Sequence, residues 1–166
     1  MNSKLRQHLN NLSIQKDGQI LATPLKAIVD RLSCCALATA GLVIKVGGST
    51  LAKTGATAFY ATVKGKLVTI AAATDMPALT GLTITAAKFN VACFYIDDAS
   101  TVTMKAGTEG ASIAAVKFPQ PPEGKTLVGA LLITHSSTFT GGTTALDTAT
   151  TVYLSPIGAF DATILL

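Results

Sequence analysis

The sequence contains no tryptophan, only three tyrosines and six phenylalanines among 166 residues, and an unusually small share of charged residues. Exposed aromatic side chains are typical of carbohydrate- and receptor-binding surfaces, so their scarcity argues against a module of that kind. Charged residues make up 13% of the chain, well below the ~25% of an ordinary soluble domain. Hydrophobic residues make up 49%. This imbalance favours subunits that bury surface in an assembly.

Long apolar runs are also lacking. The longest candidate, residues 36–44, is too short to span a membrane as a helix, so no membrane association is expected. The N-terminal residues are followed by polar ones, so no secretory signal is predicted. Three cysteines, with Cys34 next to Cys35 and Cys93 far away, fit neither a disulfide framework nor a metal site. We expect small buried side chains in a reducing cytoplasm.

Residues suited to chemistry are isolated from one another. His8 and His135 lack any hydrolase motif around them. Asp97 and Asp98 suit either a cation site or a turn. Because adjacent residues of a strand point to opposite faces, the two carboxylates would not meet at one ion, and the turn is favoured. The stretch 47–50 lacks the spacing of a phosphate loop. Residues 119–122 suit either a polyproline ligand or a rigid connector between strands. The sequence therefore predicts a protein that is not an enzyme, with no catalytic residue, cofactor or metal.

Positive charge is concentrated in the first part of the chain. Residues 1–66 hold nine of the thirteen basic residues and two acids, a net charge of +7, whereas the remainder has four lysines and seven acids, a net charge of −3. The basic residues are scattered singly, without the clustering or interleaved aromatics typical of nucleic-acid binding. Nucleic acid is therefore an unfavoured partner, and a solvated or subunit-facing basic surface is favoured.

Two helical patterns occur early and predict an N-terminal arm. Leucines at helical spacing between residues 3 and 12 predict a short amphipathic helix that needs a partner to be stable. Thr23 and Pro24 suit an N-cap and first helical position, and an apolar stripe at i, i+3, i+4 and i+7 predicts a second helix over residues 24–35. The residues of the arm expected to dock on a partner are apolar anchors and cations: Leu5, Leu9, Leu12, Leu25, Ile28, Val29, Leu32, Lys4, Arg6, Lys26 and Arg31.

From about Gly41 the apolar residues recur at the two-residue period of β-strands. A tight turn at Lys64 and Gly65 predicts a hairpin. Strands are expected over residues 42–46, 58–63, 66–71, 82–86, 90–96, 101–106, 112–118, 126–135, 150–154 and 162–166. The predicted fold is mainly β: an antiparallel β-sandwich or barrel, jelly-roll-like, preceded by a short helical arm. We divide the chain into the arm, residues 1–40, and the β domain, residues 41–166.

A sequence resemblance covers roughly residues 56–154. The strand 128–134, the Gly- and Thr-rich loop 137–147 and the strand 150–154 resemble the strand, loop and closing strand of small virion structural proteins of tailed bacteriophages. The hairpin at 59–68 and the segment 94–97 are similar in style. The resemblance implies a capsid decoration (cement) protein, a head-fibre protein or a tail component, which acts through surface complementarity. It transfers no functional residue.

The resemblance also implies the partners and the location. We expect a homo-oligomer, with a trimer favoured, that contacts the major capsid protein or another virion protein through the arm. The expected location is the virion, after assembly in the host cytoplasm. The alternative is a tail or fibre component that binds a host-surface receptor or a carbohydrate; a small enzyme is a further, less favoured class.

Overall fold

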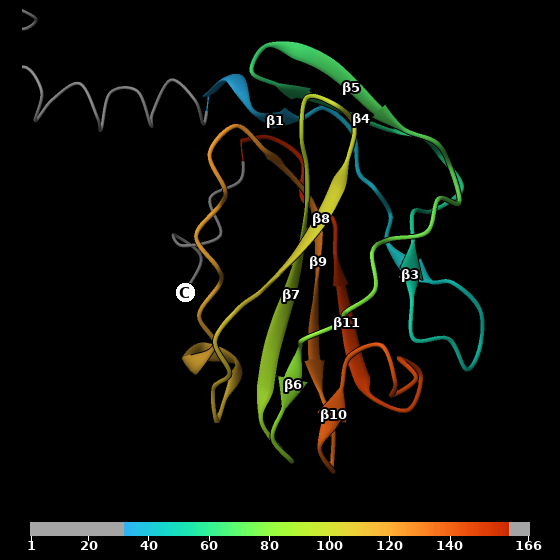
Figure 1. Ribbon diagram of the computed structural model, residues 1–166, viewed down its shortest axis with the longest axis vertical. Coiled ribbons are helices and arrows are strands. Elements are labelled where there is room, and N and C mark those ends of the chain that lie inside the picture. The colour runs from blue at the N-terminus through green and yellow to red at the C-terminus, as the bar shows by residue number, and fades with distance from the viewer. Residues whose placement is uncertain (1–31, 160–166) are drawn as a thin grey trace, which may run out of the picture.

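The computed structural model describes residues 32–159, and within this range almost all regular structure is antiparallel β-sheet (Figure 1). Leu32 and Ser33 are helical, and the parts of the predicted arm helices before Leu32 lie outside the described residues. The strands are β1 (Cys35–Ala36), β2 (Val43–Ile44), β3 (Ala52–Lys53), β4 (Phe59–Val63), β5 (Lys66–Ile70), β6 (Thr83–Ile84), β7 (Phe89–Ile96), β8 (Val102–Ala106), β9 (Thr126–Thr134), β10 (Phe139–Thr140) and β11 (Thr150–Leu154), with one 3-10 helix, η1 (Ile113–Ala115).

The largest sheet has the strand order β11-β9-β7-β8 and runs along the long axis of the molecule (Figure 1). β7 and β9 form its centre, and their pairing has a bulge between Phe94 and Tyr95. Gly129 lies opposite Phe94 at this irregularity. A Cβ on Gly129 would come within 2.6 Å of both the Leu154 carbonyl oxygen and the Leu42 side chain. Only glycine therefore lets β11 and the chain at Leu42 approach the sheet here.

A smaller sheet, with the order β1-β4-β5, lies across one end of the large sheet (Figure 1). β4 and β5 form the predicted hairpin, and the central turn residues Lys64 and Gly65 both have positive φ, 52° and 76°. That geometry matches the twist of the flanking strands. β1 pairs with β4, and Ala36 also forms an isolated bridge with Gly158. The two ends of the described chain are thus joined to each other.

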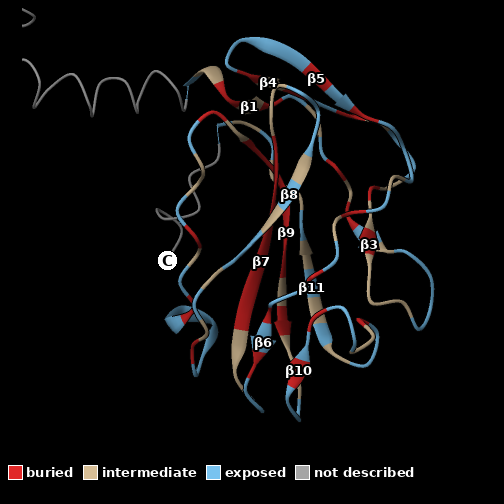
Figure 2. Cartoon of the chain, viewed as in Figure 1, coloured by how far each residue is buried: buried red, intermediate tan, exposed pale blue. Residues whose placement is uncertain are grey.

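One core is shared by the inner faces of both sheets. Alternate residues of β4 are buried, among them Phe59 and Ala61, and they belong to the same apolar cluster as Phe94 of β7 and Leu131 of β9. Figure 2 shows the burial concentrated along β7 and β9. Two short strand pairs, β6–β10 and β2–β3, add buried side chains to the same core. These side chains are Ile84 of β6, Phe139 of β10 and Ala52 of β3. The alternation seen in the sequence is therefore the alternation between core and solvent.

β7 is buried on both of its faces. Its opposite face carries Val91, Cys93 and Tyr95, which form a second apolar cluster with Val116 from the segment after β8. The Tyr95 hydroxyl donates to the carbonyl oxygen of Pro119 at 3.4 Å. This hydrogen bond gives the segment that contains Val116 a second contact with β7. A strand covered on both sides needs apolar residues at nearly every position, and this explains the continuous apolar run of β7.

Most of the predicted strands are confirmed, and three expectations are wrong. Residues 112–118 form η1 and a single bridge at Lys117 in place of a strand, because only Val116 turns inward there. The second arm helix does not extend to Cys35, since this residue pairs with Thr62 in β1. The described sheets do not close into a barrel. The predicted strand 162–166 lies outside the described residues.

Candidate interaction surface

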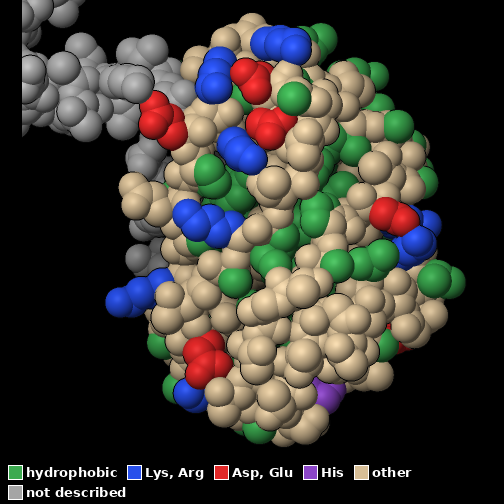
Figure 3. Space-filling view, viewed as in Figure 1, with side chains coloured by type: hydrophobic (Ala, Val, Ile, Leu, Met, Phe, Trp, Pro, Cys, Tyr) green, Lys and Arg blue, Asp and Glu red, His purple; other side chains and the backbone are tan. Residues whose placement is uncertain are grey.

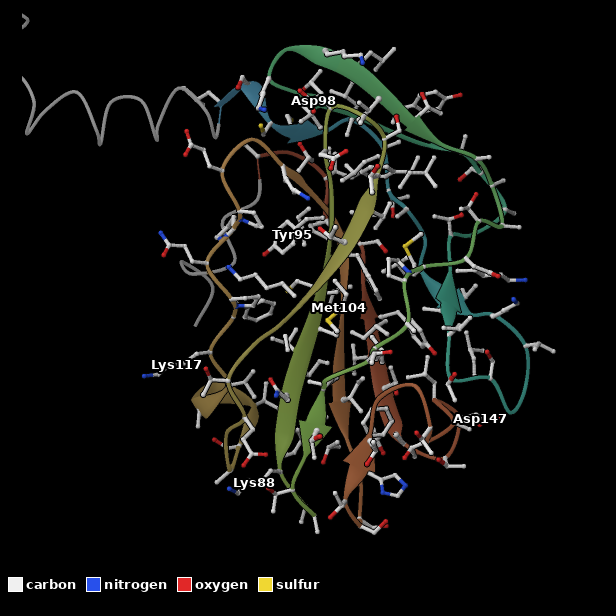
Figure 4. All side chains as sticks on the ribbon, viewed as in Figure 1. Lys88, Tyr95, Asp98, Met104, Lys117 and Asp147 are labelled. Atoms are coloured by element: carbon white, nitrogen blue, oxygen red, sulfur yellow. The ribbon has the colours of Figure 1, made fainter. Side chains whose placement is uncertain are left out.

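The charged residues that the structure describes are spread over the molecule and do not gather at one site (Figure 4). Figure 4 shows Asp98 at one end of the molecule, Lys88 towards the other, and Lys117 and Asp147 on opposite margins. Among residues 32–159 there is no group of three or more His, Cys, Asp or Glu residues that could hold a metal ion. Each candidate instead has a local structural role.

Asp97 closes the turn between β7 and β8. Its Oδ1 accepts hydrogen bonds from the backbone N–H groups of Thr101 at 2.9 Å and Ala99 at 3.1 Å. The bond from Thr101 is the main reason that the pKa of Asp97 lies below its ordinary value, and Lys125, 3.4 Å away, contributes as well. Asp98 faces Lys64 at 3.5 Å. The turn interpretation of Asp97 and Asp98 is confirmed.

The loop at residues 47–50 is a connection between β2 and β3. Gly48, with φ of 76°, donates its N–H to Asp147 Oδ2 at 2.6 Å, and Ser49 O accepts the N–H of Leu146 at 2.9 Å. These bonds join the loop to the segment before β11. The interpretation of this stretch as a turn is confirmed.

His135 and Ser137 close the turn from β9 to β10. His135 Nδ1 accepts the backbone N–H of Ser137 at 3.1 Å and lies 2.9 Å from the Ser137 hydroxyl. These contacts of the ring nitrogen stabilise a local turn. His135 and Ser137 therefore have a structural role in the connection between β9 and β10.

Cys34 and Cys93 are buried and Cys35 is partly exposed, and all three thiols are free. Burial raises the pKa of the Cys93 thiol to about 12. A thiol with so high a pKa is a poor nucleophile. The expectation of small buried side chains is confirmed for Cys34 and Cys93.

The most distinctive surface is the side of the three-stranded sheet that faces away from the core, here called the outer apolar face. β1, β4 and β5 align Cys35 with Thr62 and Leu67, and Tyr60 with Thr69. Leu37 joins the second row, because its N–H donates to the Tyr60 carbonyl oxygen at 2.9 Å. The face therefore consists of Cys35, Leu37, Tyr60, Thr62, Leu67 and Thr69, and none of these side chains is charged.

Three large side chains stand exposed on the outer apolar face. Leu67 is 60% exposed, Leu37 53% and Tyr60 44%. Single exposed apolar residues are common on protein surfaces, but here three large ones share one face of a sheet. A second and smaller pair, Val152 and Leu154, is exposed on β11 at the edge of the large sheet.

The charged side chains near this end of the molecule mostly pair with one another. Lys125 lies against Asp97, Lys64 lies against Asp98, and Lys66 Nζ donates to the carbonyl oxygen of Asp98 at 2.8 Å. Figure 3 shows cations and acids gathered at this end and along both margins, whereas uncharged atoms cover most of the rest of the face in view. Paired charges leave the exposed apolar residues as the main candidates for binding energy.

Of the eleven predicted docking residues, the structure describes Leu32, which is 70% exposed next to β1. The other ten, Leu5, Leu9, Leu12, Leu25, Ile28, Val29, Lys4, Arg6, Lys26 and Arg31, lie outside the described residues. Sequence reasoning missed the outer apolar face, because its members come from three separate segments.

A comparison of the chain with protein-family models, curated proteins and solved structures found no match. Residues 32–159 include no helix that is long and apolar enough to cross a membrane.

Proposed function

We propose that this chain is a non-enzymatic virion structural protein of a tailed bacteriophage, which self-associates and docks on the phage particle as a capsid decoration (cement) protein. The observation that carries the proposal is the outer apolar face, with Leu37, Tyr60 and Leu67 between 44% and 60% exposed. A lone subunit would leave this surface in water. Covering the surface with a partner would contribute a favourable free energy of ~25 cal/mol for each Å² of apolar area removed from water.

The resemblance to virion proteins supplies the particular class. The segments that carry it correspond to β9, β10, the Gly- and Thr-rich loop that follows, and β11. We take the β domain to be a jelly-roll-like sandwich, since the inner faces of its two main sheets share one core. In this proposal the β domain forms the oligomer, three copies being favoured by the resemblance. The helical arm then contacts the major capsid protein or another virion protein.

The low charge of the chain and its free thiols suit this role. Surfaces made of methyl and hydroxyl groups associate at close range without the cost of desolvating ions. Free cysteines suit assembly in the reducing host cytoplasm before the virion is released.

The experiment compares phage particles assembled with and without the chain. Full-length protein is added back to particles that lack it, and its co-sedimentation with them is measured. We expect saturable binding that Leu9→Asp in the arm weakens at least tenfold and that Ile113→Asp, a substitution at an exposed site on η1, leaves unchanged. Absence of the chain from purified particles, together with no binding on add-back, would overturn the proposal.

A further inference from the structure

The point where the N-terminal segment joins the β domain is well defined. Leu32 and Ser33 are helical, and Ser33 O accepts the N–H of Gly65 at 3.2 Å, so the segment leaves the β domain at the β4–β5 turn. β1 begins at Cys35, only two residues later. No connecting loop is available between the helical residues and β1 to let the segment turn back over its own sheet.

Leu32 is the last residue of the apolar stripe that the sequence predicts for this segment, and the structure describes it. The sequence places Leu25, Ile28, Val29 and Leu32 on one side of a predicted helix, and side chains at this spacing point in the same direction. Leu32 is 70% exposed, whereas Cys34, two residues on, is 8% exposed. Leu32, the one residue of the stripe that the structure describes, therefore stands exposed beside β1.

A short amphipathic helix of this kind needs an apolar partner surface. A single helix of about ten residues is marginal in water, and its stability comes from packing its apolar side. The outer apolar face lies at the same end of the molecule and also lacks a cover. Within this face, the Thr62 hydroxyl donates to the Cys35 carbonyl oxygen at 3.4 Å. The Thr62 hydroxyl therefore already has a hydrogen-bond partner. A helix packed there would bury Leu37, Tyr60 and Leu67 without stranding that hydroxyl.

From these observations we infer that residues 24–32 of one copy pack on the outer apolar face of a neighbouring copy. Thirty-one residues precede the described chain, which begins at the edge strand of this sheet, so each copy offers both the segment and the face at one end. Such a head-to-tail contact repeats from copy to copy and closes into a ring when the rotation between copies permits. The inference rests on the proposed self-association and leaves Leu5, Leu9 and Leu12 for the particle.

Photo-cross-linking of the full-length chain tests the contact directly. A benzophenone amino acid replaces Leu67, and equal amounts of 14N- and 15N-labelled protein are mixed before irradiation. We expect cross-linked dimers that join one isotope to the other, with the tryptic peptide 27–31 attached at position 67. The same probe at Ile113, exposed on η1, serves as the control and is expected to give no such product. Cross-links to residues 24–32 of the same chain, or only to other segments, would overturn the inference.

Matched substitutions separate this contact from particle docking. Leu67→Asp on the face and Ile28→Asp on the stripe are each expected to reduce the mass in light scattering to that of one chain, whereas Ile113→Asp keeps the wild-type mass. Circular dichroism checks that each variant is folded. A monomeric wild type, or unchanged mass in folded Leu67→Asp, contradicts the inference. The effect of Leu9→Asp on co-sedimentation with particles tests the proposed function separately, because that residue lies outside the stripe.

Discussion

Glu109 Oε2 accepts the backbone N–H of Thr85 at 3.0 Å, and this bond connects the segment after β8 to the end of β6. The second oxygen of Glu109 accepts from the Thr85 hydroxyl at 3.1 Å and from Lys88 Nζ at 2.9 Å. These bonds, with the one from the Thr85 N–H contributing most, lower the pKa of Glu109 from 4.5 to about 2. These three hydrogen bonds could not be predicted from the sequence, because Glu109 is more than twenty residues from Thr85 and Lys88.

Glu109→Gln should lower the free energy of unfolding in a pH-dependent way. Since the pKa of Glu109 is lower in the folded chain than in the unfolded chain, its contribution is full above about pH 4.5 and is lost as the pH falls towards 2. We expect the difference between wild type and variant to be largest near pH 6 and to shrink at pH 3, as measured by urea unfolding across this range. A difference that is independent of pH would contradict the assigned role.

Ala87→Gly should stabilise the fold. Ala87 has φ of 60° in the turn closed by the Lys88 N–H and the Thr85 carbonyl oxygen, at 3.0 Å. A left-handed conformation costs a residue with a Cβ roughly 1–2 kcal/mol, and the greater freedom of glycine in the unfolded chain offsets part of the gain. We expect a net increase of about 0.5–1 kcal/mol in thermal or denaturant unfolding.

The matched control for that substitution is Ala86→Gly in the same turn. Ala86 is not among the residues with positive φ, so glycine there only adds freedom to the unfolded chain and should lower stability by about 0.5–1 kcal/mol. Equal effects of the two substitutions would show that the backbone angle at Ala87 is not the cause.

Gly129→Ala should destabilise the central sheet. The added methyl group would lie 2.6 Å from the Leu154 carbonyl oxygen, a backbone atom that moves only if β11 shifts. We expect a loss of about 1–3 kcal/mol in denaturant unfolding, as is usual for overpacking. Gly47→Ala is the control, because the nearest atom to its new methyl group is Asp147 Oδ2 at an ordinary 3.8 Å. That control should stay within about 0.5 kcal/mol of wild type.

Cys93 should resist thiol reagents for as long as the protein is folded. It is completely buried in β7 and burial raises its pKa to about 12, so almost no thiolate forms at pH 8. We expect mass spectrometry after brief alkylation at pH 8 to find Cys93 unmodified, with Cys93 labelled only after denaturation. Rapid labelling of Cys93 in the folded protein would show that the segment covering β7 opens readily.

The long strands could be predicted from the sequence because each has at least five residues that either alternate, as in β4, or form a continuous apolar run, as in β7. β11 has the predicted bounds, and β4 differs from its prediction by one residue. β1, β3 and β10 contain two residues each, too few to show any period. β1 pairs with the longer β4, whereas β3 and β10 pair with strands that are equally short, β2 and β6. Residues 112–118 contain four consecutive apolar residues, 113–116, but only Val116 and the ring of Phe118 have a cluster to join.

The outer apolar face could not be predicted, because adjacent apolar residues do not reveal which side of a strand is covered. Leu67 and Val68 are neighbours of similar hydropathy, yet one is 60% exposed and the other 2%. The choice depends on the pairing of β5 with β4 and of β4 with β1, which joins residues up to 27 positions apart. A one-residue shift of that register would exchange the two sides.

The bridge between Ala36 and Gly158 has a consequence for biosynthesis. Two hydrogen bonds, 3.1 Å from the Ala36 N–H and 2.8 Å from the Gly158 N–H, tie the first strand to a residue 122 positions later. While the ribosome still holds residue 158, β1 lacks this contact and β9 lacks its neighbour β11. A nascent chain therefore cannot finish its sheets until translation has passed this point, and the sheets are complete only after nearly the whole described region has emerged.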